Sequence, residues 1–418
     1  MVEATVQLLG NVVGAHGAVD IHGYVAPGFE RVVGAFQDNF TRHGEIGAAC
    51  AAYVDGEPVV DIWGGWRVLE GRAPWQSNTM VLVMSTTKGL TALVMARLHS
   101  DQMFDFDCPV SRYWPEFADR GKSAITVRQL LAHQAGLAAI DTPLTLELMG
   151  DAERLDEMLG RQEPLWKPGT RHGYHAATLG FFQNALVRRA DRSRRSIGML
   201  LRDRFALEAG LDLHIGLPDS VGPDRLADLV VKRDWVALFR TLPFATIISG
   251  FNPKGLVFRV GTNPRLKSLT ELATRRYLNL ELPSFGGVVT ARALAKAYSL
   301  FAAGGQKLGI SPKTIRELEA PGITPSGGGI DMFYGIPTAY ALGFSKPFPA
   351  FPFGSDDRAY GTPGAGGSQG FADPATGLGF AYTPNRLNVG VLDDDRARSL
   401  RGTVYSCLQS ARAGATHV

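Results

Sequence analysis

The chain has 418 residues, with 43 Lys and Arg against 40 Asp and Glu, so its formal net charge is only +3. Apolar residues make up 45% of it and charged residues 20%, which is ordinary for a globular protein and excludes an intrinsically disordered chain. So small a charge over this length produces no field that would attract nucleic acid. The unusual count is glycine, at 49. Without a Gly-X-Y repeat, this excess indicates backbone with special dihedral angles or close approaches.

The length of the chain and its cysteines further limit the class of protein. A single hydrophobic core stops growing at this length, so we expect two packed lobes. The longest apolar runs are far shorter than the ~20 residues that cross a bilayer, and no Lys or Arg precedes Arg31 to form the basic start of a signal peptide. Cys50, Cys108 and Cys407 are odd in number and far apart, which favours buried reduced thiols. We therefore expect a cytoplasmic protein without a membrane span.

The first elements predicted are two strands within residues 45–66. They are β-rich runs separated by Asp55-Gly56, a strong hairpin signal. A helix is predicted over residues 85–98, because apolar side chains recur there at helical spacing.

The pattern then turns helical, with short loops, over residues 105–204. Within it, Thr126 is a plausible cap at the start of the helix TVRQLLAHQAGL, and Gly136 a plausible residue to end it. The arginines over residues 188–204 are interrupted by Asp191 and Asp203, which is typical of a solvated helix face rather than a nucleic-acid patch.

Residues 235–283 mix apolar, aromatic, Pro and Gly residues with poor periodicity, so we expect irregular structure. Thr290 then caps a clear helix that ends at Gly304-Gly305.

The last part of the chain is rich in glycine and short strands. GFADPATGLGFAYTP predicts a hairpin with Asp373-Pro374 near its turn, followed by a strand over 388–392 (NVGVL) and a helix over 397–411. Strands at both ends and helices between them predict an α/β (α+β) fold in which one lobe is interrupted by another.

We expect the domain boundaries to follow this pattern. Residues 1–104 and 285–418 would form a discontinuous α/β domain, and residues 105–284 a mostly helical one. Within the helical part, the irregular stretch 235–283 is expected to line a pocket, since ligand sites are mostly apolar with few polar anchors.

Ser85 and Lys88 form an S-x-x-K pair at the start of the first predicted helix. Positions three apart lie on one face of a helix, so the Lys88 amine can reach the Ser85 hydroxyl. A serine needs a neighbour to accept its proton before it attacks, and a lysine does this when burial lowers its pKa towards neutrality. Alone the motif is weak, and the alternative is a helix cap beside a solvated lysine.

Two further segments supply context: residues 168–180 read PGTRHGYHAATLG and residues 360–371 read YGTPGAGGSQGF. Residues 85–88 (STTK), 174–176 (YHA) and 362–364 (TPG) resemble, in order, the three motifs of the serine β-lactamase and penicillin-recognising superfamily. The closest likeness is to the class C β-lactamase-like (family VIII) carboxylesterases, and it covers most of the chain. It implies a β-lactamase/transpeptidase-like fold, in which helices flank an antiparallel sheet and an all-α lobe is inserted.

The resemblance also implies roles. Ser85 would attack the carbonyl, and Lys88 and Tyr174 together would be the general base, with Tyr174 as the acid toward the leaving group. A tyrosine phenolate is accessible near neutrality only beside a cation, which Lys88 would supply. The oxyanion hole would use the backbone N–H groups of Ser85 and Ala365. Neither a metal nor a cofactor is implied.

Gly364 and Thr362 would border the substrate together with Ala365. Two positions depart from the lactamase pattern. Ala176 stands where lactamases carry an Asn that helps hold the substrate amide, which argues for esters over lactams. Thr362 stands where lactamases carry Lys, so a cation for a substrate carboxylate is missing at this position.

Other motifs have plainer explanations. Residues 366–370 match the G-x-S-x-G nucleophile elbow around Ser368, but that elbow requires a helix after it, and here a hairpin follows. His172 and His175 have no acidic or Cys partner nearby, so a metal site is not expected and His175 is expected to support Tyr174 or its loop. His133 is expected to pack or bond within its helix.

The sequence therefore predicts a serine hydrolase that cleaves small-molecule carboxylic esters with short to medium acyl chains through a Ser85 acyl-enzyme. Alternatives that stay open are an acyltransferase using the same intermediate, a weak β-lactamase or peptidase, and an inactive protein that binds acylated ligands. No nucleic-acid partner is expected, and homo-oligomerisation is left open.

Overall fold

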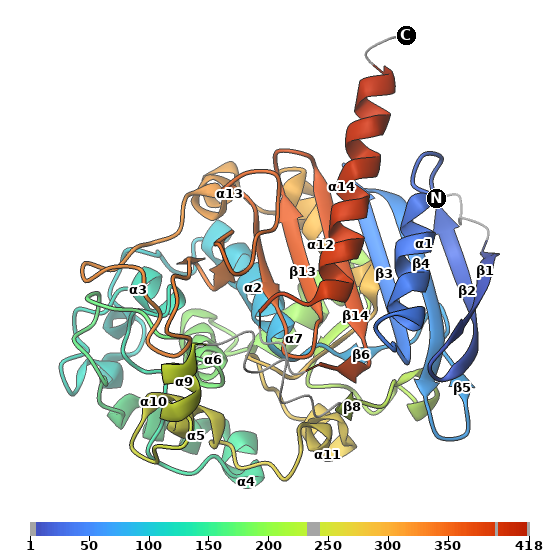
Figure 1. Cartoon of the computed structure of the whole chain (residues 1–418). Coiled ribbons are helices and arrows are strands. Elements are labelled where there is room, and N and C mark those ends of the chain that lie inside the picture. The colour runs from blue at the N-terminus through green and yellow to red at the C-terminus, as the bar shows by residue number, and fades with distance from the viewer. Residues whose placement is uncertain (1–5, 232–242, 389–391, 416–418) are drawn as a thin grey trace.

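A computed structural model describes residues 6–231, 243–388 and 392–415. Among them, ten strands form one antiparallel sheet in the order β1-β2-β4-β3-β14-β13-β12-β11-β10, with the short β5 paired to β4 (Figure 1). In that order the strands are β1 (Gln7–Gly14), β2 (Gly17–Val25), β4 (Glu57–Val68), β3 (Gly47–Val54), β14 (Leu378–Pro384), β13 (Gln369–Asp373), β12 (Tyr360–Pro363), β11 (Phe344–Ser345) and β10 (Tyr340–Ala341), with β5 at Ala73–Pro74. This sheet confirms the predicted fold class.

Both predicted hairpins are present. β3 and β4 meet at Asp55 and Gly56, whose φ angles of 51° and 88° suit a tight hairpin turn. β13 and β14 form the second hairpin, and β14 pairs with β3 at the centre of the sheet. The two ends of the chain therefore share one sheet.

Helices cover both faces of the sheet. α12 (Ala291–Ala302) packs on one face, and α1 (Arg31–Thr41) lies beside α14 (Asp395–Ala415) on the other (Figure 1). β3 is buried on both sides, with Cys50 in the cluster under α1 and α14 and Ala51 in the cluster under α12. A strand covered on both faces reads as a continuous apolar run, which explains the sequence GAACAAYV.

Close packing between a helix and the sheet explains one of the many glycines. A Cβ at Gly379 of β14 would lie 2.1 Å from the backbone nitrogen of Ser299 in α12. Only glycine lets this helix approach the sheet so closely.

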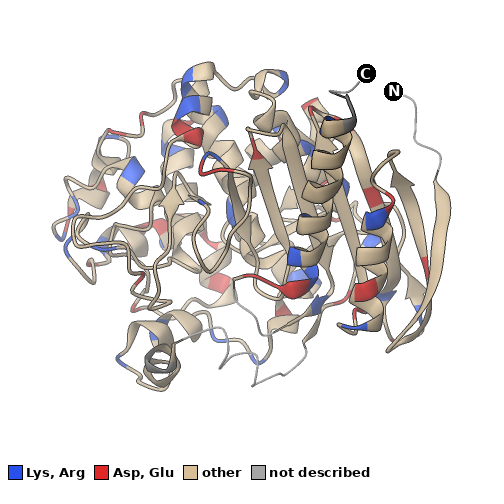
Figure 2. Cartoon of the chain, turned by 45° about the horizontal axis from the view of Figure 1, so that its top comes forward, with Lys and Arg blue, Asp and Glu red and all other residues tan. Residues whose placement is uncertain are grey.

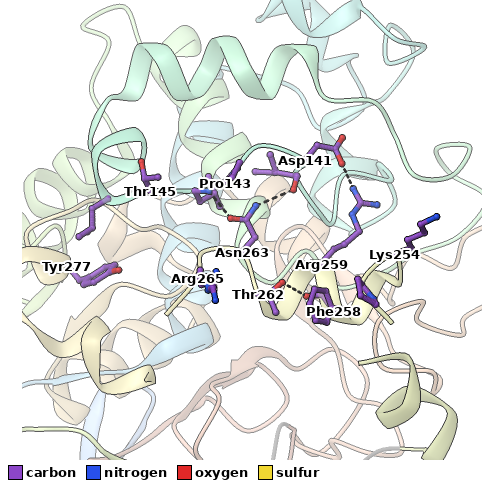
Figure 3. A pocket seen from close by; sticks show the side chains of 14 residues that line it. Asp141, Pro143, Thr145, Lys254, Phe258, Arg259, Thr262, Asn263, Arg265 and Tyr277 are labelled. Atoms are coloured by element: carbon purple, nitrogen blue, oxygen red, sulfur yellow. Dashed lines mark hydrogen bonds and ion pairs between the residues drawn. The ribbon is translucent and has the colours of Figure 1, made fainter. Parts of the chain in front are cut away.

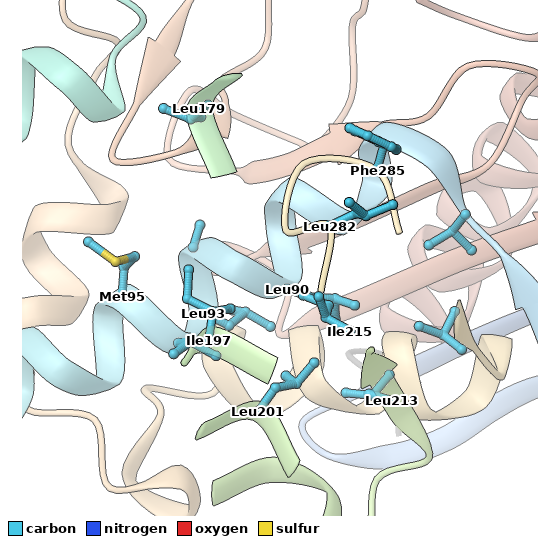
Figure 4. Packing of buried hydrophobic residues seen from close by; sticks show 14 of the residues in the cluster. Leu90, Leu93, Met95, Leu179, Ile197, Leu201, Leu213, Ile215, Leu282 and Phe285 are labelled. Carbon is cyan, nitrogen blue, oxygen red and sulfur yellow. The ribbon is translucent and has the colours of Figure 1, made fainter. Parts of the chain in front are cut away.

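The helix α2 (Thr87–Ser100) is buried almost all round. The remaining helices lie mainly to one side of the sheet (Figure 1). They are α3 (Val127–Leu131), α4 (Leu146–Gly150), α5 (Ala152–Arg161), α6 (Thr178–Ala190), α7 (Ile197–Leu201), α9 (Phe244–Ser249), α10 (Leu256–Gly261), α11 (Arg275–Leu278) and α13 (Pro312–Glu319). Figure 4 shows Leu90 and Leu93 of α2 packed among Ile197, Ile215 and Leu282. Two small sheets, β6 (Val81–Leu82), β9 (Gly287–Val289) and β7 (Leu213–Ile215), and β15 (Arg386–Leu387) with β8 (Val230–Val231), complete the described fold.

Several predicted elements differ from the structure. α3 is capped by Thr126 as predicted, but it ends at Leu131 rather than near Gly136, because the chain turns at His133 with a φ of +60°. The described part of residues 235–283 is only partly irregular: between its turns it contains α9, α10 and α11, which are too short to show a helical period. The centre of the predicted strand NVGVL, residues 389–391, lies outside the described residues.

The N-terminal strands β1 and β2 and the helix α1 were not predicted. The helix capped by Thr290 is confirmed, and so is the last helix, which is longer than predicted at Asp395–Ala415. The three cysteines are free as expected; Cys50 and Cys407 are buried, whereas Cys108 is only half-buried.

Charged side chains are interspersed over the elements in view in Figure 2. The predicted solvated arginine face is partly wrong, because Arg188 and Arg189 both form ion pairs with the buried carboxylate of Asp156. No helix among the described residues is long and apolar enough to cross a membrane.

Candidate active site

Ser85 lies in a short 3-10 turn, Met84–Thr86, that leads into α2. Met84 has a φ of +49°, a left-handed conformation that is uncommon for a residue with a side chain. The Thr87 hydroxyl fixes this turn, since it donates to the Met84 carbonyl at 2.5 Å and accepts from the Gly287 N–H at 2.8 Å. The serine is therefore held at the start of α2 by residues from β9.

Lys88 is buried one turn further along α2, with 1% of its surface exposed. Its Nζ donates to the carbonyls of Ala176 and Ser284 at 2.6 and 3.0 Å, and lies 4.7 Å from the centre of the Tyr174 ring. Burial lowers the pKa of Lys88 to about 7. A neutral amine has two N–H donors, which these carbonyls occupy, and one lone pair that remains to accept a proton.

Tyr174 joins the other two residues. Its phenol lies close to the Ser85 side chain, and its ring packs 5.3 Å from the ring of Tyr334 and 6.2 Å from that of Tyr340. Burial raises the pKa of Tyr174 well above its ordinary value, and the nearby Ser85 hydroxyl lowers it by less. Tyr174 is therefore a neutral phenol near pH 7.

Asp331 supports Tyr174, a role that the sequence does not predict. It is fully buried, and one of its oxygens accepts from the backbone N–H groups of Tyr174, Phe333 and Tyr334 at 3.3, 2.7 and 3.0 Å. The Tyr340 hydroxyl donates to the other at 2.9 Å. The only signal in the sequence is an isolated acid among glycines and apolar residues (GGGIDMFYG).

Two neutral histidines hold the loop around Tyr174. The Nδ1 of His175 bonds the Gly173 carbonyl at 2.6 Å, while its Nε2 accepts from the Leu137 N–H at 3.0 Å. His133 lies after α3 rather than within a helix, and its Nδ1 accepts from the His175 N–H at 3.0 Å. Burial lowers the pKa of His175 to about 3 and that of His133 well below its ordinary value.

The third motif lies against the Ser85 turn. Gly364 follows β12, and its N–H donates to the Ser368 carbonyl at 2.7 Å. The Ser368 hydroxyl donates to the Val83 carbonyl at 2.8 Å and lies 3.0 Å from the Thr86 hydroxyl. A Cβ at Gly364 would lie 2.1 Å from the Ser368 Oγ, so only glycine fits here. With its hydroxyl engaged and 4% of its surface exposed, Ser368 acts as a clamp between the two segments.

Two backbone donors remain at this junction. Among the backbone hydrogen bonds of the described residues, none uses the N–H of Ser85 or of Ala365. Both residues are partly exposed, so these groups can reach a bound molecule.

A buried ion network supports the loop that carries Ala365. Arg396 is fully buried, and it pairs with Glu45 at 2.7 Å and with Asp394 at 2.9 Å. Its Nη2 also donates to the Gly366 carbonyl at 2.6 Å. The Arg396 guanidinium therefore ties the loop after β12 to the start of α14 and to the segment before β3.

Thr362 and Ala176 lie in different surroundings. Thr362 is 2% exposed, and its side chain lies beside the Tyr298 hydroxyl under the first turn of α2 at Gly89. The Ala176 methyl group packs against the apolar cluster of Ala138, Ala139 and Val260. A polar amide in place of that methyl group would lose solvent without gaining an evident partner.

Part of residues 235–283 lines a cavity of about 700 Å³ beside α10 (Figure 3). Ser85, Lys88 and Tyr174 are not among the residues that line it. Within the part of the chain that the structure describes, no group of His, Cys, Asp or Glu is arranged to hold a metal ion.

Comparison with known proteins shows the family. The profile of the family described as Beta-lactamase matches residues 29–404. The chain belongs to the beta-lactamase family. It is 33% identical over 399 residues to "Esterase/beta-lactamase LipL" of Mycobacterium tuberculosis, a match that spans 94% of this chain and 89% of that protein.

Solved structures give the same result. A family VIII carboxylesterase superposes with a TM-score of 0.81 at 32% identity, covering 93% of this chain and 99% of that one. A penicillin-binding protein homologue from Caulobacter crescentus superposes with a TM-score of 0.80 at 32% identity, covering 93% and 100%. The chain is therefore a serine hydrolase of the β-lactamase-like superfamily, with that superfamily's fold.

Proposed function

We propose that the chain is a carboxylesterase that acts through an acyl-enzyme on Ser85. The observation that carries this proposal is the group formed by the Ser85 hydroxyl, the Tyr174 phenol close to it, and the buried Lys88 amine beside the phenol ring. Nothing in the packing of a helix start requires all three. The esterases among the chain's relatives supply the ester as substrate class.

Acylation begins with neutral Lys88. As the Ser85 oxygen attacks the ester carbonyl, its proton moves to the Tyr174–Lys88 pair, for which the lone pair on Nζ is the acceptor. The directions of the two pKa shifts favour a neutral phenol beside a neutral amine over a phenolate beside an ammonium. Tyr174 then donates a proton to the departing alcohol as the Ser85 ester forms.

The developing oxyanion needs donors that are already in place. The N–H groups of Ser85 and Ala365 have this property, because neither donates to a backbone carbonyl of the described residues. One such donor usually contributes ~2.7–4 kcal/mol to the transition state. In deacylation, water takes the place of the alcohol and loses a proton to the same pair as it attacks the acyl carbon. The bond from that carbon to the Ser85 oxygen then breaks, the pair returns the proton to this oxygen, and the acid leaves.

Esters suit this site better than lactams. Ala176 offers an apolar methyl group where an amide side chain would be needed to bind a substrate amide, and Thr362 is buried under α2 and carries no charge. In this proposal Thr362 supports the start of α2, and Gly364 lets the substrate lie close to backbone.

Pre-steady-state kinetics test the proposal. The wild-type chain should release a burst of p-nitrophenol from p-nitrophenyl butyrate and then turn over, and its intact mass should show one butyryl adduct. Ser85→Ala should lose the burst, the adduct and the turnover. Ser111→Ala is the matched control, because that hydroxyl bonds only the Ser123 carbonyl in an exposed loop. Full turnover by folded Ser85→Ala would remove Ser85 as the nucleophile.

A further inference from the structure

Exposed apolar side chains gather beside Tyr174. In and after α9, Ile248 is 54% exposed and Phe251 79% exposed. In the loop that holds Asp331, Ile330 is 54% and Met332 38% exposed. Large apolar side chains that face water in a group mark a surface that meets another apolar phase or a partner.

These segments contact one another and border the candidate site. The Thr246 hydroxyl of α9 donates to the carbonyl of Tyr334 at 3.0 Å, and the ring of Tyr334 packs against Tyr174. Phe333 packs in one cluster with Leu256 of α10. The exposed residues therefore belong to one face, which lies over the aromatic side of the site.

The charge of this face is positive. Residues 165–173, 248–259 and 323–337 contain four Lys or Arg, whereas the one acid is Asp331, which is fully buried. Lys167 and Lys254 are both exposed. We call the exposed side chains of Ile248, Phe251, Ile330 and Met332, together with those of Lys167 and Lys254, the α9–α10 face.

The cavity of Figure 3 adds to this charge. It is lined by Lys254, Arg259 and Arg265 together with Phe258 and Tyr277, which lies at the end opposite to Lys254. Arg259 pairs with Asp141 at 2.6 Å, whereas Lys254 and Arg265 form no ion pair with any described residue. The cations are suited to bind an anionic headgroup, and the apolar side chains beside them are suited to contact an uncharged acyl chain.

We propose that the α9–α10 face docks on a lipid surface with anionic headgroups and takes ester substrates from that surface to Ser85. We propose a lipid rather than a protein as the partner because the face combines exposed apolar side chains with lysines. Such a combination matches the boundary between the headgroups and the acyl chains of a membrane. This inference rests on the proposed esterase function for the substrate. Its docking step stands independently.

Vesicle binding tests the docking step. The full chain carrying Ser85→Ala, which keeps the face but should not turn over, is mixed with vesicles of phosphatidylcholine alone or with phosphatidylglycerol added, and then sedimented. Binding should require phosphatidylglycerol and weaken with salt. Lys254→Glu should weaken it at least about fivefold, because each cation near an anionic surface contributes ~1 kcal/mol. Phe251→Asp should also weaken it.

Leu207→Asp is the matched control, since Leu207 is 72% exposed but lies outside the α9–α10 face. It should bind as the Ser85→Ala parent does. Absence of binding to phosphatidylglycerol vesicles overturns the proposal, and so does an equal loss in Leu207→Asp and Phe251→Asp.

Activity measurements separate this inference from the esterase function. Phe251→Asp, with Ser85 intact, should hydrolyse monomeric p-nitrophenyl acetate at the wild-type rate but should lose rate on a p-nitrophenyl ester carried in phosphatidylglycerol vesicles. Equal rates on both substrates would overturn the docking role and leave the esterase function standing. A wild-type chain that binds the vesicles but hydrolyses neither ester would refute the esterase function and leave docking standing.

Discussion

Titration of Lys88 is expected to switch hydrolysis on between about pH 6 and pH 8. Burial lowers the pKa of this amine from 10.5 to about 7. Since only the neutral amine can accept the Ser85 proton, kcat/KM should rise about tenfold over those two pH units and then level off. An ordinary lysine would still be almost wholly protonated at the top of that range.

The same shift affects stability. Between pH 7 and the unfolded pKa of 10.5, the unfolded chain binds a proton at Lys88 that the folded chain does not, so the folded state becomes more stable as the pH rises. Lys88→Met removes this dependence. Wild type should therefore gain about 2 kcal/mol of stability between pH 7 and pH 9 that Lys88→Met does not gain. The free energy of unfolding of the variant minus that of wild type should be about 2 kcal/mol larger at pH 7 than at pH 9.

Both effects can be measured on one preparation. Initial rates on p-nitrophenyl acetate, corrected for the ionisation of the product, give the kinetic profile, and urea unfolding of the two chains at both pH values gives the difference. A kinetic midpoint near pH 10, or a Lys88→Met difference that is the same at both pH values, would refute the assignment of a neutral Lys88.

Three further substitutions test the supports of the site. Gly364→Ala should lower kcat by about 10²–10³ at saturating ester, because the new Cβ pushes on Ser368 and displaces the neighbouring oxyanion donor; wild-type kcat would contradict the placement of this loop. Arg396→Met should destabilise the chain by about 3–5 kcal/mol in urea unfolding, because it leaves Glu45 buried without its cation, and a loss below 1 kcal/mol would count against the network. Asp331→Ala should cost about 2–4 kcal/mol and most of kcat, since it leaves buried N–H groups unpaired, whereas Asp331→Asn, which keeps an acceptor, should retain most of both. Equal losses in the two Asp331 variants would show that its charge, rather than its hydrogen bonds, matters.

Local signals account for most of what was predicted correctly. The Asp55-Gly56 turn marks its hairpin, and Thr290 accepts from the Ala293 N–H to begin α12. Such turn and cap signals depend only on residues a few positions apart, so they can be recognised from a single sequence. The three motifs depend on resemblance rather than on spacing, and the structure places Ser85, Lys88 and Tyr174 side by side.

The residues that were missed act over long distances. Asp331 reaches Tyr174 across 157 positions, and Arg396 reaches Glu45 across 351. Each is a charged residue of a kind normally found at the surface, and only the fold shows that it is buried and paired. The short helices α9 and α10 were not predicted for another reason. One or two helical turns within a Pro- and Gly-rich segment are too short to show a helical period of apolar residues.

The route of the chain has a consequence for biosynthesis. The N–H of Gly47, at the start of β3, bonds the Asn385 side chain 338 positions away, and β14 must pair with β3 to complete the centre of the sheet. Contacts between such distant residues form slowly, and a ribosome delivers them last. A nascent chain that already contains Ser85 and Lys88 still lacks the loop between β12 and β13, which carries Gly364 and Ala365. We therefore expect the nascent chain to stay inert until almost the whole polypeptide has emerged, and hydrolytic activity to appear in a single late step of synthesis.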